Sequence, residues 1–307
     1  MILSKPNHIK IYGHRGARGD LPENTLESFK YLFENNINAY ETDILISKDL
    51  IPVITHDFRL DPSLTKDNDG NWIEDENIKI FDLTYEELLK FDVGSINKLS
   101  RYGRRFVNQK PLENQRIPKL SELLALSSKN ISENLLINLE IKSTPDEENL
   151  TPAPEYTVKL VVDEINVSNL KDKIIVSSFD WRTLTEIKNQ YPEISRAYLT
   201  YQQVRGMKIK KTIYNRSPWM SFLPFYEDHE LPKIIKSQGG KAWHPYRKDI
   251  TKKLVNISHQ EDLPVNVWTV NEEYEMLKMI EYGVDGIMTD YPLRLKELCE
   301  KENINWF

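Results

Sequence analysis

Three carboxylates lie in runs of the sequence that are typical of β-strands. Glu41 and Asp43 stand in AYETDILIS (39–47), and Glu140 follows the apolar part of LLINLEIK (135–142). Residues two apart in a strand share a face, so Glu41 and Asp43 point the same way. If that face is turned to solvent, the pair is made of ordinary surface charges. If it lines an interior together with Glu140, the three groups repel one another unless a cation binds between them.

The chemistry of this acidic cluster indicates a hard cation. Three carboxylates supply only oxygen donors, and Cys299 is the single cysteine of the chain, so Mg²⁺ or Ca²⁺ fits the set better than zinc. No other group that would neutralise the carboxylates is evident. Lys142, two residues after Glu140, either presents a positive charge to the same pocket or forms a surface salt bridge. The pattern predicts one divalent cation on Glu41, Asp43 and Glu140.

Two histidines and an arginine stand where strands are predicted to end. His14 and Arg15 occur in YGHRGARGDLPENTLESF (12–29), and His56 occurs in PVITHD, after a run that can pair back along the strand of Glu41. One neutral and one protonated imidazole make a general base and a general acid. The guanidinium of Arg15 has the planar fork that suits a phosphate. A basic surface turn is the plain alternative, but the acidic cluster favours a site that binds an anion beside a metal.

Eight β-rich runs alternate with helical patterns, which predicts a parallel (β/α)₈ barrel. An open doubly wound sheet is the competing architecture, but no G-x-G-x-x-G follows the first run. One helical pattern has Thr25 as its predicted N-cap, and another ends at Gly283. Barrel enzymes keep their sites at the carboxyl ends of the strands. The predicted strands cover residues 9–14, 39–47, 135–142, 173–180, 195–201, 240–246, 264–270 and 285–292.

Residues 57–117 interrupt this alternation. The stretch has turn signals such as Asp61-Pro62 and Asp69-Gly70, short strand fragments and one brief helical pattern near TYEELLK. It is too long for an ordinary connecting loop and too polar for a large separate domain. We expect a small insertion after the second strand, seated on one end of the barrel, within a single domain over residues 9–302.

Composition limits the partners and the location of the protein. Lys and Arg number 41, Asp and Glu number 47, and the net charge is −6, which argues against nucleic acid or an anionic membrane as a general partner. The start of the chain, MILSKPNHIKIYGHRG, lacks the apolar core of a signal peptide. No window approaches the roughly 18 apolar residues of a membrane span. We expect a cytoplasmic protein with a small-molecule substrate and no integral membrane segment; the oligomeric state is not indicated.

Five motifs, HRGARGDLPENTLESF, ETDILISKDLIPVITHD, LEIK, VWTVN and GIMTDYP, together resemble the glycerophosphodiester phosphodiesterase family. The resemblance extends over nearly the whole chain. It implies a (β/α)₈ barrel with an insertion after the second strand, and a divalent metal on Glu41, Asp43 and Glu140. It further implies the following roles: acid and base for His14 and His56, phosphate binding for Arg15 and Lys142, and a pocket for the alcohol lined by Trp268.

The resemblance implies metal-dependent hydrolysis of glycerophosphodiesters to sn-glycerol 3-phosphate and an alcohol. The competing enzyme function is a phospholipase D-like phosphodiesterase that acts on lysophospholipids or other lipid head groups. In that case NRSPWMSFLPFYEDHELP (215–232) would contact the acyl chain, although we favour packing of this segment against the barrel rim. A catalytically silent phosphate-binding module is disfavoured, because none of the key residues is missing. We interpret the basic run MKIKKT (207–212) as a solvated face and expect the ring of His244 to pair with backbone.

Overall fold

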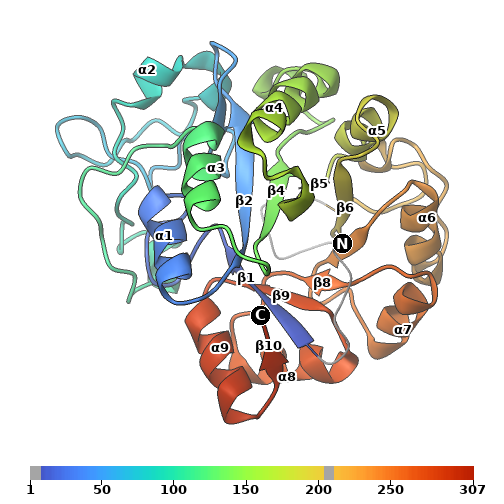
Figure 1. The fold of residues 1–307 in the computed structure, drawn as a ribbon. Coiled ribbons are helices and arrows are strands. Elements are labelled where there is room, and N and C mark those ends of the chain that lie inside the picture. The colour runs from blue at the N-terminus through green and yellow to red at the C-terminus, as the bar shows by residue number, and fades with distance from the viewer. Residues whose placement is uncertain (1–7, 204–210) are drawn as a thin grey trace.

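Eight parallel strands form a nearly closed barrel in the computed structural model, which describes residues 8–203 and 211–307 (Figure 1). The barrel strands are β1 (His8–His14), β2 (Ala39–Ile46), β4 (Leu136–Ile141), β5 (Ile174–Ser178), β6 (Ser195–Thr200), β7 (Ala242–Pro245), β8 (Asn266–Val267) and β9 (Gly286–Thr289). Their order is β7, β6, β5, β4, β2, β1, β9 and β8, and two isolated bridges, Trp243–Val265 and Tyr246–Trp268, join β7 to β8. The predicted (β/α)₈ barrel is confirmed.

Two further strands pair with the barrel from outside its main path. β3 (Pro52–Ile54) runs antiparallel to β2, which is the hairpin predicted before His56. β10 (Asn305–Trp306) pairs in parallel with the start of β1 and was not predicted, because its run is too short to show a period. The last barrel strands are shorter than predicted: β8 and β9 hold two and four residues.

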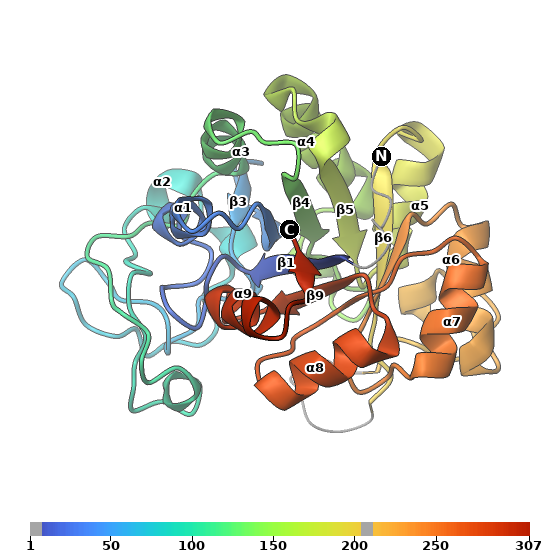
Figure 2. The same cartoon turned by 60° about the horizontal axis from the view of Figure 1, so that its bottom comes forward.

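Helices surround the barrel and cover its outer face (Figures 1 and 2). They are α1 (Leu26–Glu34), α3 (Leu120–Lys129), α4 (Pro154–Ser168), α5 (Trp181–Gln190), α6 (Leu231–Ser237), α7 (Lys252–Gln260), α8 (Glu273–Tyr282) and α9 (Pro292–Lys301). The Thr25 side chain accepts from the backbone N–H of Ser28 and caps α1, as predicted. Gly283 ends α8 at φ 83°, a left-handed conformation that favours glycine. The start of α1 at Thr25 and the end of α8 at Gly283 therefore agree with the prediction from the sequence.

Alternation along the strands divides the apolar side chains between two cores. Ile9 and Ile11 of β1 face the helices and join the main hydrophobic core, whereas Tyr12 packs inside the barrel with Leu199 and Met288. His14 shares the face of Tyr12 and so points into the barrel at its carboxyl end. Polar side chains of the strands, such as that of His14, thus lie at the carboxyl end of the barrel interior, beside the apolar residues of this inner core.

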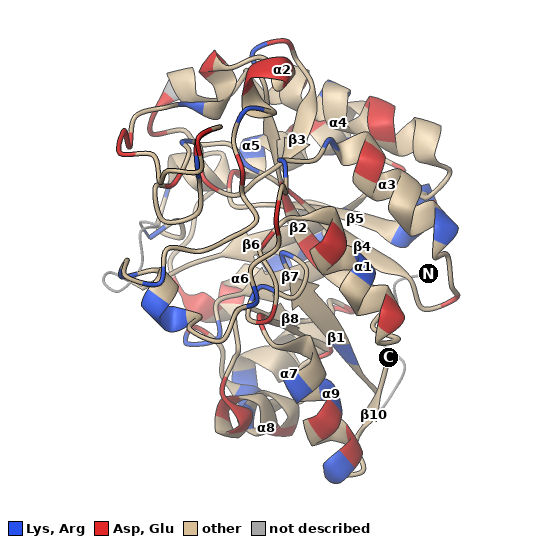
Figure 3. Cartoon of the chain, turned by 90° about the vertical axis from the view of Figure 1, so that its left-hand side faces the viewer, with Lys and Arg blue, Asp and Glu red and all other residues tan. Residues whose placement is uncertain are grey.

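The inserted segment builds a small core of its own. It contains η1 (Ile80–Asp82), α2 (Tyr85–Leu88) and η2 (Gly103–Arg105). Figure 3 faces the side of the molecule that carries this segment and shows acidic and basic residues over its loops. Its buried apolar residues Leu60, Ile80, Leu88 and Ile117 pack on Leu45 and Val53 of the β2–β3 hairpin. The segment thus rests on the hairpin that follows the carboxyl end of β2.

The aromatic-rich stretch after β6 packs mainly inward. Trp219, Met220 and Phe225 are buried, in agreement with packing against the rim, whereas Phe222 and Tyr226 are 61% and 70% exposed. The remaining short helices are η3 (Glu148–Leu150), η4 (Lys171–Lys173), η5 (Pro218–Met220) and η6 (Asp228–Glu230). Most of the basic run 207–212 lies outside the described residues. Among the described helices, none combines the length and the apolar character needed to cross a membrane.

Candidate active site

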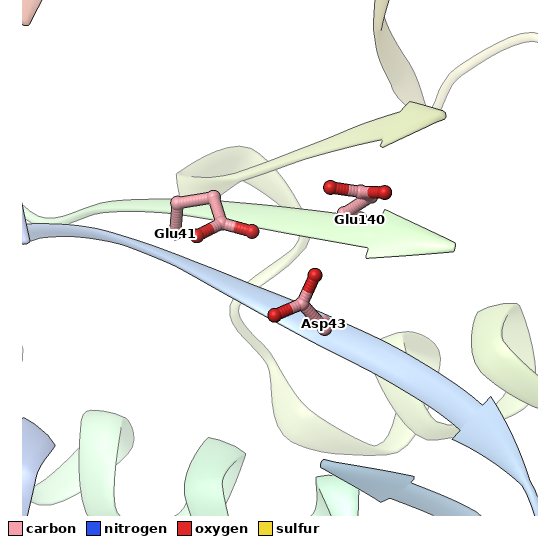
Figure 4. A group of neighbouring side chains, drawn as sticks. All are labelled: Glu41, Asp43 and Glu140. Carbon is pink, nitrogen blue, oxygen red and sulfur yellow. The ribbon is translucent and has the colours of Figure 1, made fainter. Parts of the chain in front are cut away.

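The three carboxylates predicted from the sequence meet at the carboxyl end of the barrel. Asp43 of β2 lies in register with Glu140 of β4, and Glu41 precedes Asp43 on the same face. One oxygen from each of the three groups lies within 4.8 Å of the others, and all three residues are buried. Figure 4 shows the carboxylates pointing toward one another from the two neighbouring strands. The alternative that Glu41 and Asp43 face solvent is therefore wrong.

Two cationic side chains lie against the acidic cluster. Lys142 Nζ donates to Glu140 Oε1 at 2.7 Å and lies 3.5 Å from Asp43 Oδ1, while Arg15 Nε lies 3.2 Å from Asp43 Oδ2. The expectation that no group neutralises the carboxylates is wrong, since it missed Arg15, which directly follows the neighbouring strand β1. The Lys142 side chain is 10% exposed, so the alternative of a surface salt bridge is wrong as well.

The cluster retains oxygen atoms that could bind a divalent cation despite these contacts. Glu41 Oε1 and Asp43 Oδ1 are buried and accept no hydrogen bond from any described residue. Five carboxyl groups of the site lie among three fixed cations, so two negative charges are left uncompensated when all five are ionised. The groups are Glu23, Glu41, Asp43, Glu140 and Asp290, and the cations are Arg15, Arg18 and Lys142. Oxygen donors with this charge balance suit a hard divalent ion.

The two carboxylates of β2 differ in their protonation. Burial, followed by the charges of Asp43 and Glu140, raises the pKa of Glu41 well above its usual value. Burial also opposes charge on Asp43, but the electrostatic influence of the neighbouring His56, Arg15 and Lys142 outweighs this effect and holds the pKa of Asp43 far below its usual range. Of the two carboxyl groups, Glu41 is therefore the one that takes up a proton more readily.

His14 is held by a buried carboxylate from the other end of the chain. Its Nδ1 lies 2.7 Å from Asp290 Oδ1, and its Nε2 lies 3.7 Å from Glu41 Oε2. Burial, together with the nearby charge of Arg18, lowers the pKa of His14 to about 4 despite the contact with Asp290. The ring is neutral near pH 7, and a proton on Nδ1 directed at Asp290 leaves the Nε2 lone pair free toward the acidic cluster.

Asp290 itself is fixed by two donors that the sequence did not single out. Arg18 donates through Nε to Oδ1 at 2.7 Å and through Nη2 to Oδ2 at 2.9 Å, and Asn271 Nδ2 donates to Oδ2 at 2.7 Å. Asp290 and Asn271 stand in the motifs GIMTDYP and VWTVN. The signal that could have found Asp290 is its position, two residues after an inward-facing Met288, directly beyond β9.

The turn after β1 contributes more residues than were predicted. The backbone N–H of Arg15, at φ 55°, donates to Glu41 Oε2 at 3.1 Å, and Nη1 of Arg15 donates to Glu23 Oε1 at 2.7 Å. Asn24 Nδ2 donates to Asp43 Oδ2 at 3.0 Å. Glu23 and Asn24 of the PENT turn (22–25) therefore both contact site residues. Arg15 is thus part of a buried charge network and not of a basic surface turn.

His56 lies at the mouth, on the side of the inserted segment. Its Nδ1 lies 2.8 Å from Asp57 Oδ1, and its side chain is 29% exposed. It lines a hollow together with Glu23 and Asn24 of the opening turn and Gln109 of the inserted segment. The two histidines therefore approach the acidic cluster differently, His14 from within the barrel and His56 from its solvent-facing rim.

Aromatic rings form the opposite wall of the site. The ring of Trp268 lies 5.3 Å from that of Phe179, 5.1 Å from that of Tyr246 and 6.2 Å from that of Tyr201, measured between centroids. Lys142 Nζ lies 6.0 Å from the centre of Phe179, which joins this wall to the cluster. Trp268 Nε1 donates to the backbone carbonyl of His244.

His244 lies deeper, in the barrel interior. It is fully buried, and its Nε2 lies 3.0 Å from Asn266 Nδ2. The expectation that its ring pairs with backbone is therefore wrong, because the partner is a side chain of the neighbouring strand. Burial, with the charge of Lys10, lowers its pKa to about 3, so the ring is neutral and belongs to the barrel packing beneath the site.

Fixed cations beside a carboxylate cluster, at the carboxyl end of a (β/α)₈ barrel, form a site that can bind an anionic substrate next to a divalent metal. Residues 14–294 match the model of the glycerophosphoryl diester phosphodiesterase family. The chain belongs to this family, whose activity is the hydrolysis of glycerophosphodiesters.

Known proteins agree with this assignment over nearly their full lengths. A curated glycerophosphodiester phosphodiesterase from Bacillus altitudinis is 27% identical over 296 residues, with 95% of this chain and 98% of that protein covered. The crystal structure of a putative glycerophosphoryl diester phosphodiesterase from Silicibacter pomeroyi is 33% identical, has a TM-score of 0.88, and is matched over 99% of this chain and 97% of that chain. A phosphodiesterase from Oleispira antarctica, solved with the product sn-glycerol-3-phosphate, is 24% identical with a TM-score of 0.68, at 95% and 96% coverage.

Proposed function

We propose that the protein hydrolyses glycerophosphodiesters to sn-glycerol 3-phosphate and an alcohol, with the help of one divalent cation. The observation that carries the proposal is the buried cluster of Glu41, Asp43 and Glu140, two of whose oxygens accept no hydrogen bond from the described residues. The related phosphodiesterase from Oleispira antarctica was solved with sn-glycerol-3-phosphate, which supports a substrate of this class. The cytoplasm is the proposed location.

Glu41, Asp43 and Glu140 hold the cation, Mg²⁺ or Ca²⁺, in this proposal. When bound, it neutralises phosphate charge and polarises the P–O bond. Arg15 and Lys142 flank the cluster and are the fixed charges that hold the phosphate. Both cations already touch Asp43, so a phosphate that arrives beside the cluster meets donors positioned in advance and does not need to order mobile side chains.

His14 is the general base and His56 the general acid. The neutral His14 ring, with Nδ1 directed at Asp290, offers Nε2 to the proton of the nucleophile, which is water or a hydroxyl of the substrate. His56, at the mouth beside Asp57, donates a proton to the departing alkoxide, whose unassisted departure is unfavourable. The difference in burial between the two rings supports this division.

The aromatic wall around Trp268 contacts the alcohol part of the substrate. Its rings supply an apolar face opposite the charged cluster, so a substrate with one anionic and one less polar end binds in one orientation. A lysophospholipid or another lipid head group is the second candidate substrate class. The observation that favours it is the exposure of Phe222 and Tyr226 on the segment after β6.

A turnover panel tests the proposed function. The protein is stripped with EDTA and assayed with glycerophosphocholine, glycerophosphoethanolamine and lysophosphatidylcholine, each with no metal, Mg²⁺ or Ca²⁺, and the products are identified by ³¹P NMR. We expect sn-glycerol 3-phosphate from the first two substrates, only with metal. Glu140→Gln should lose turnover, while Glu133→Gln, an exposed residue before β4, should keep it. Full activity of the stripped protein would refute the metal, and turnover of the lysolipid alone would favour the second substrate class.

A further inference from the structure

One surface of the inserted segment combines positive charge with exposed apolar side chains. Between Asp92 and Glu113 the sequence contains no acidic residue. The same stretch carries five exposed basic residues, namely Lys98, Arg101, Arg104, Arg105 and Lys110. In a chain of net charge −6, such a cluster is a local exception that the proposed chemistry of the site does not use. We call residues 98–110 the basic tip.

The basic tip also presents two apolar side chains to solvent. Leu99 is 87% exposed and Val107 is 53% exposed. Leu99 is displayed by a tight turn, in which its backbone N–H donates to Asn97 Oδ1 at 3.1 Å. Exposed apolar side chains flanked by Lys and Arg are the composition of segments that lie on lipid surfaces, where the apolar groups insert and the cations meet the head groups.

The tip is a supported structure. Phe106 is buried, and the guanidinium of Arg105 lies 5.3 Å from its ring and 5.6 Å from that of Tyr102. The guanidinium of Arg18 also lies 5.0 Å from the centre of the Phe106 ring. These contacts hold the charged and apolar groups in one arrangement, so their exposure is a property of the fold.

The basic tip borders the mouth of the barrel. The hydroxyl of Tyr102 donates to Glu23, accepts from Arg18 Nη1 at 3.1 Å, and so connects the tip to the buried site. Figure 2 shows the short η2 turn, in green-blue, at the outer edge of the loops of the inserted segment and apart from the barrel helices. A surface bound by the tip would therefore lie next to the entrance of the site.

Residues 222–230 also expose aromatic side chains, but their charge does not suit the same partner. Phe222 and Tyr226 are exposed, but Glu227, Asp228 and Glu230 follow directly. An anionic surface would be repelled there. Charge complementarity thus favours an anionic partner for the basic tip over residues 222–230.

We propose that the basic tip docks on an anionic lipid surface and brings the mouth of the barrel to it. This inference concerns binding and does not depend on the proposed function. Each basic residue close to an anionic leaflet strengthens binding by about fivefold, and the gain is lost beyond a Debye length of about 10 Å or in high salt. The negative charge of the rest of the chain limits docking to an orientation that points the tip at the surface.

Vesicle co-sedimentation tests the proposal with the full chain. We expect binding to phosphatidylcholine vesicles that contain phosphatidylglycerol, no binding to pure phosphatidylcholine, and loss of binding in high salt. The charge-reversed variant Lys98→Glu/Arg101→Glu/Arg104→Glu should weaken binding by about 100-fold, and Leu99→Ser/Val107→Ser should weaken it as well. Both should keep the thermal midpoint and, in the absence of vesicles, wild-type turnover of glycerophosphocholine.

A matched control separates the tip from net charge. Lys171→Glu/Lys241→Glu/Lys301→Glu makes the same change in net charge at exposed positions near the amino ends of the strands, and it should bind vesicles like the wild type. Equal losses in the two triple variants would overturn the proposal. It would also be overturned by wild-type protein that ignores phosphatidylglycerol, or that binds single-stranded RNA but no vesicles.

Discussion

Asp290 positions His14, and its replacement by Asn should show this directly. In the folded protein the Asp290 carboxylate accepts from His14 Nδ1, from Arg18 through two nitrogens, and from Asn271. Asn at this position has nearly the same shape but no charge, and one of its oxygens becomes an NH₂ group. That group then faces nitrogen donors on every side, so at least one of the former hydrogen bonds is lost.

The magnitude of the effect follows from these contacts. Arg18 is 4% exposed, and removal of the partner of a buried charge typically costs about 3–5 kcal/mol of unfolding free energy. If the amide NH₂ turns to His14, the ring must place its proton on Nε2, which removes the lone pair offered to the nucleophile. Positioned proton transfer contributes about 10²–10⁴-fold, so kcat should fall by that factor.

A second Asp–His pair, in which Asp285 is buried and His259 is exposed, supplies the control for this experiment. Asp285 contacts His259 Nε2 at 2.8 Å and accepts from Val265 N at 2.8 Å, but it precedes β9 and so lies at the end of the barrel remote from the site. We measure kcat for glycerophosphocholine and the unfolding free energy of Asp290→Asn and Asp285→Asn. Both variants should lose stability, and only Asp290→Asn should lose turnover. A kcat for Asp290→Asn within about threefold of the wild type would refute the positioning role, since a factor of 10² or more is required.

The remaining predictions concern the metal, the phosphate and the protons. Glu140→Ala should lower metal affinity, measured by calorimetry, together with turnover. Because burial raises the pKa of Glu41, metal binding to the wild type should release a proton. Equal binding heats in buffers of different ionisation enthalpy would contradict this proton release. Arg15→Lys keeps the charge but loses the bidentate fork, so turnover should drop at an unchanged fold by circular dichroism. His56→Ala should lower kcat by about 10²–10⁴-fold and retain metal affinity, whereas loss of metal would make it a ligand. The pKa of His14 falls from 6.5 to about 4 on folding, so the unfolded chain gains a proton first and stability is lost as pH falls through this window; His14→Asn should flatten that part of the thermal profile.

The barrel and the residues at its strand ends could be predicted from the sequence because both depend on local pattern. Alternation in AYETDILIS places Glu41 and Asp43 on one face, and the apolar run before Glu140 marks a buried strand. The structure brings these three groups together. Strand lengths near the β7–β8 junction were overestimated, because the ladder there reduces to single bridges that no local pattern reports.

The support of the site could not be predicted, because it consists of contacts between distant parts of the chain. His14 and Asp290 are 276 residues apart, and Tyr102 and Glu23 are 79 apart. Which arginine pairs with which carboxylate depends on how the barrel closes and where the inserted segment crosses its mouth. For this reason Arg15 could be predicted to bind a phosphate, but its ion pair with Asp43 could not.

The separate core of the inserted segment has a consequence for how such proteins diversify. Leu45 and Val53 on the β2–β3 hairpin provide the apolar floor on which Leu60, Ile80 and Leu88 pack, and the barrel strands draw on a different set of side chains for their own packing. A lineage can therefore exchange the segment as a module, keeping the hairpin floor and the tyrosine that reaches Glu23, without rebuilding the scaffold that carries the chemistry. The inserted segment carries substrate access and surface attachment, whereas the barrel carries bond cleavage. Selection can therefore alter the residues of one without altering those of the other.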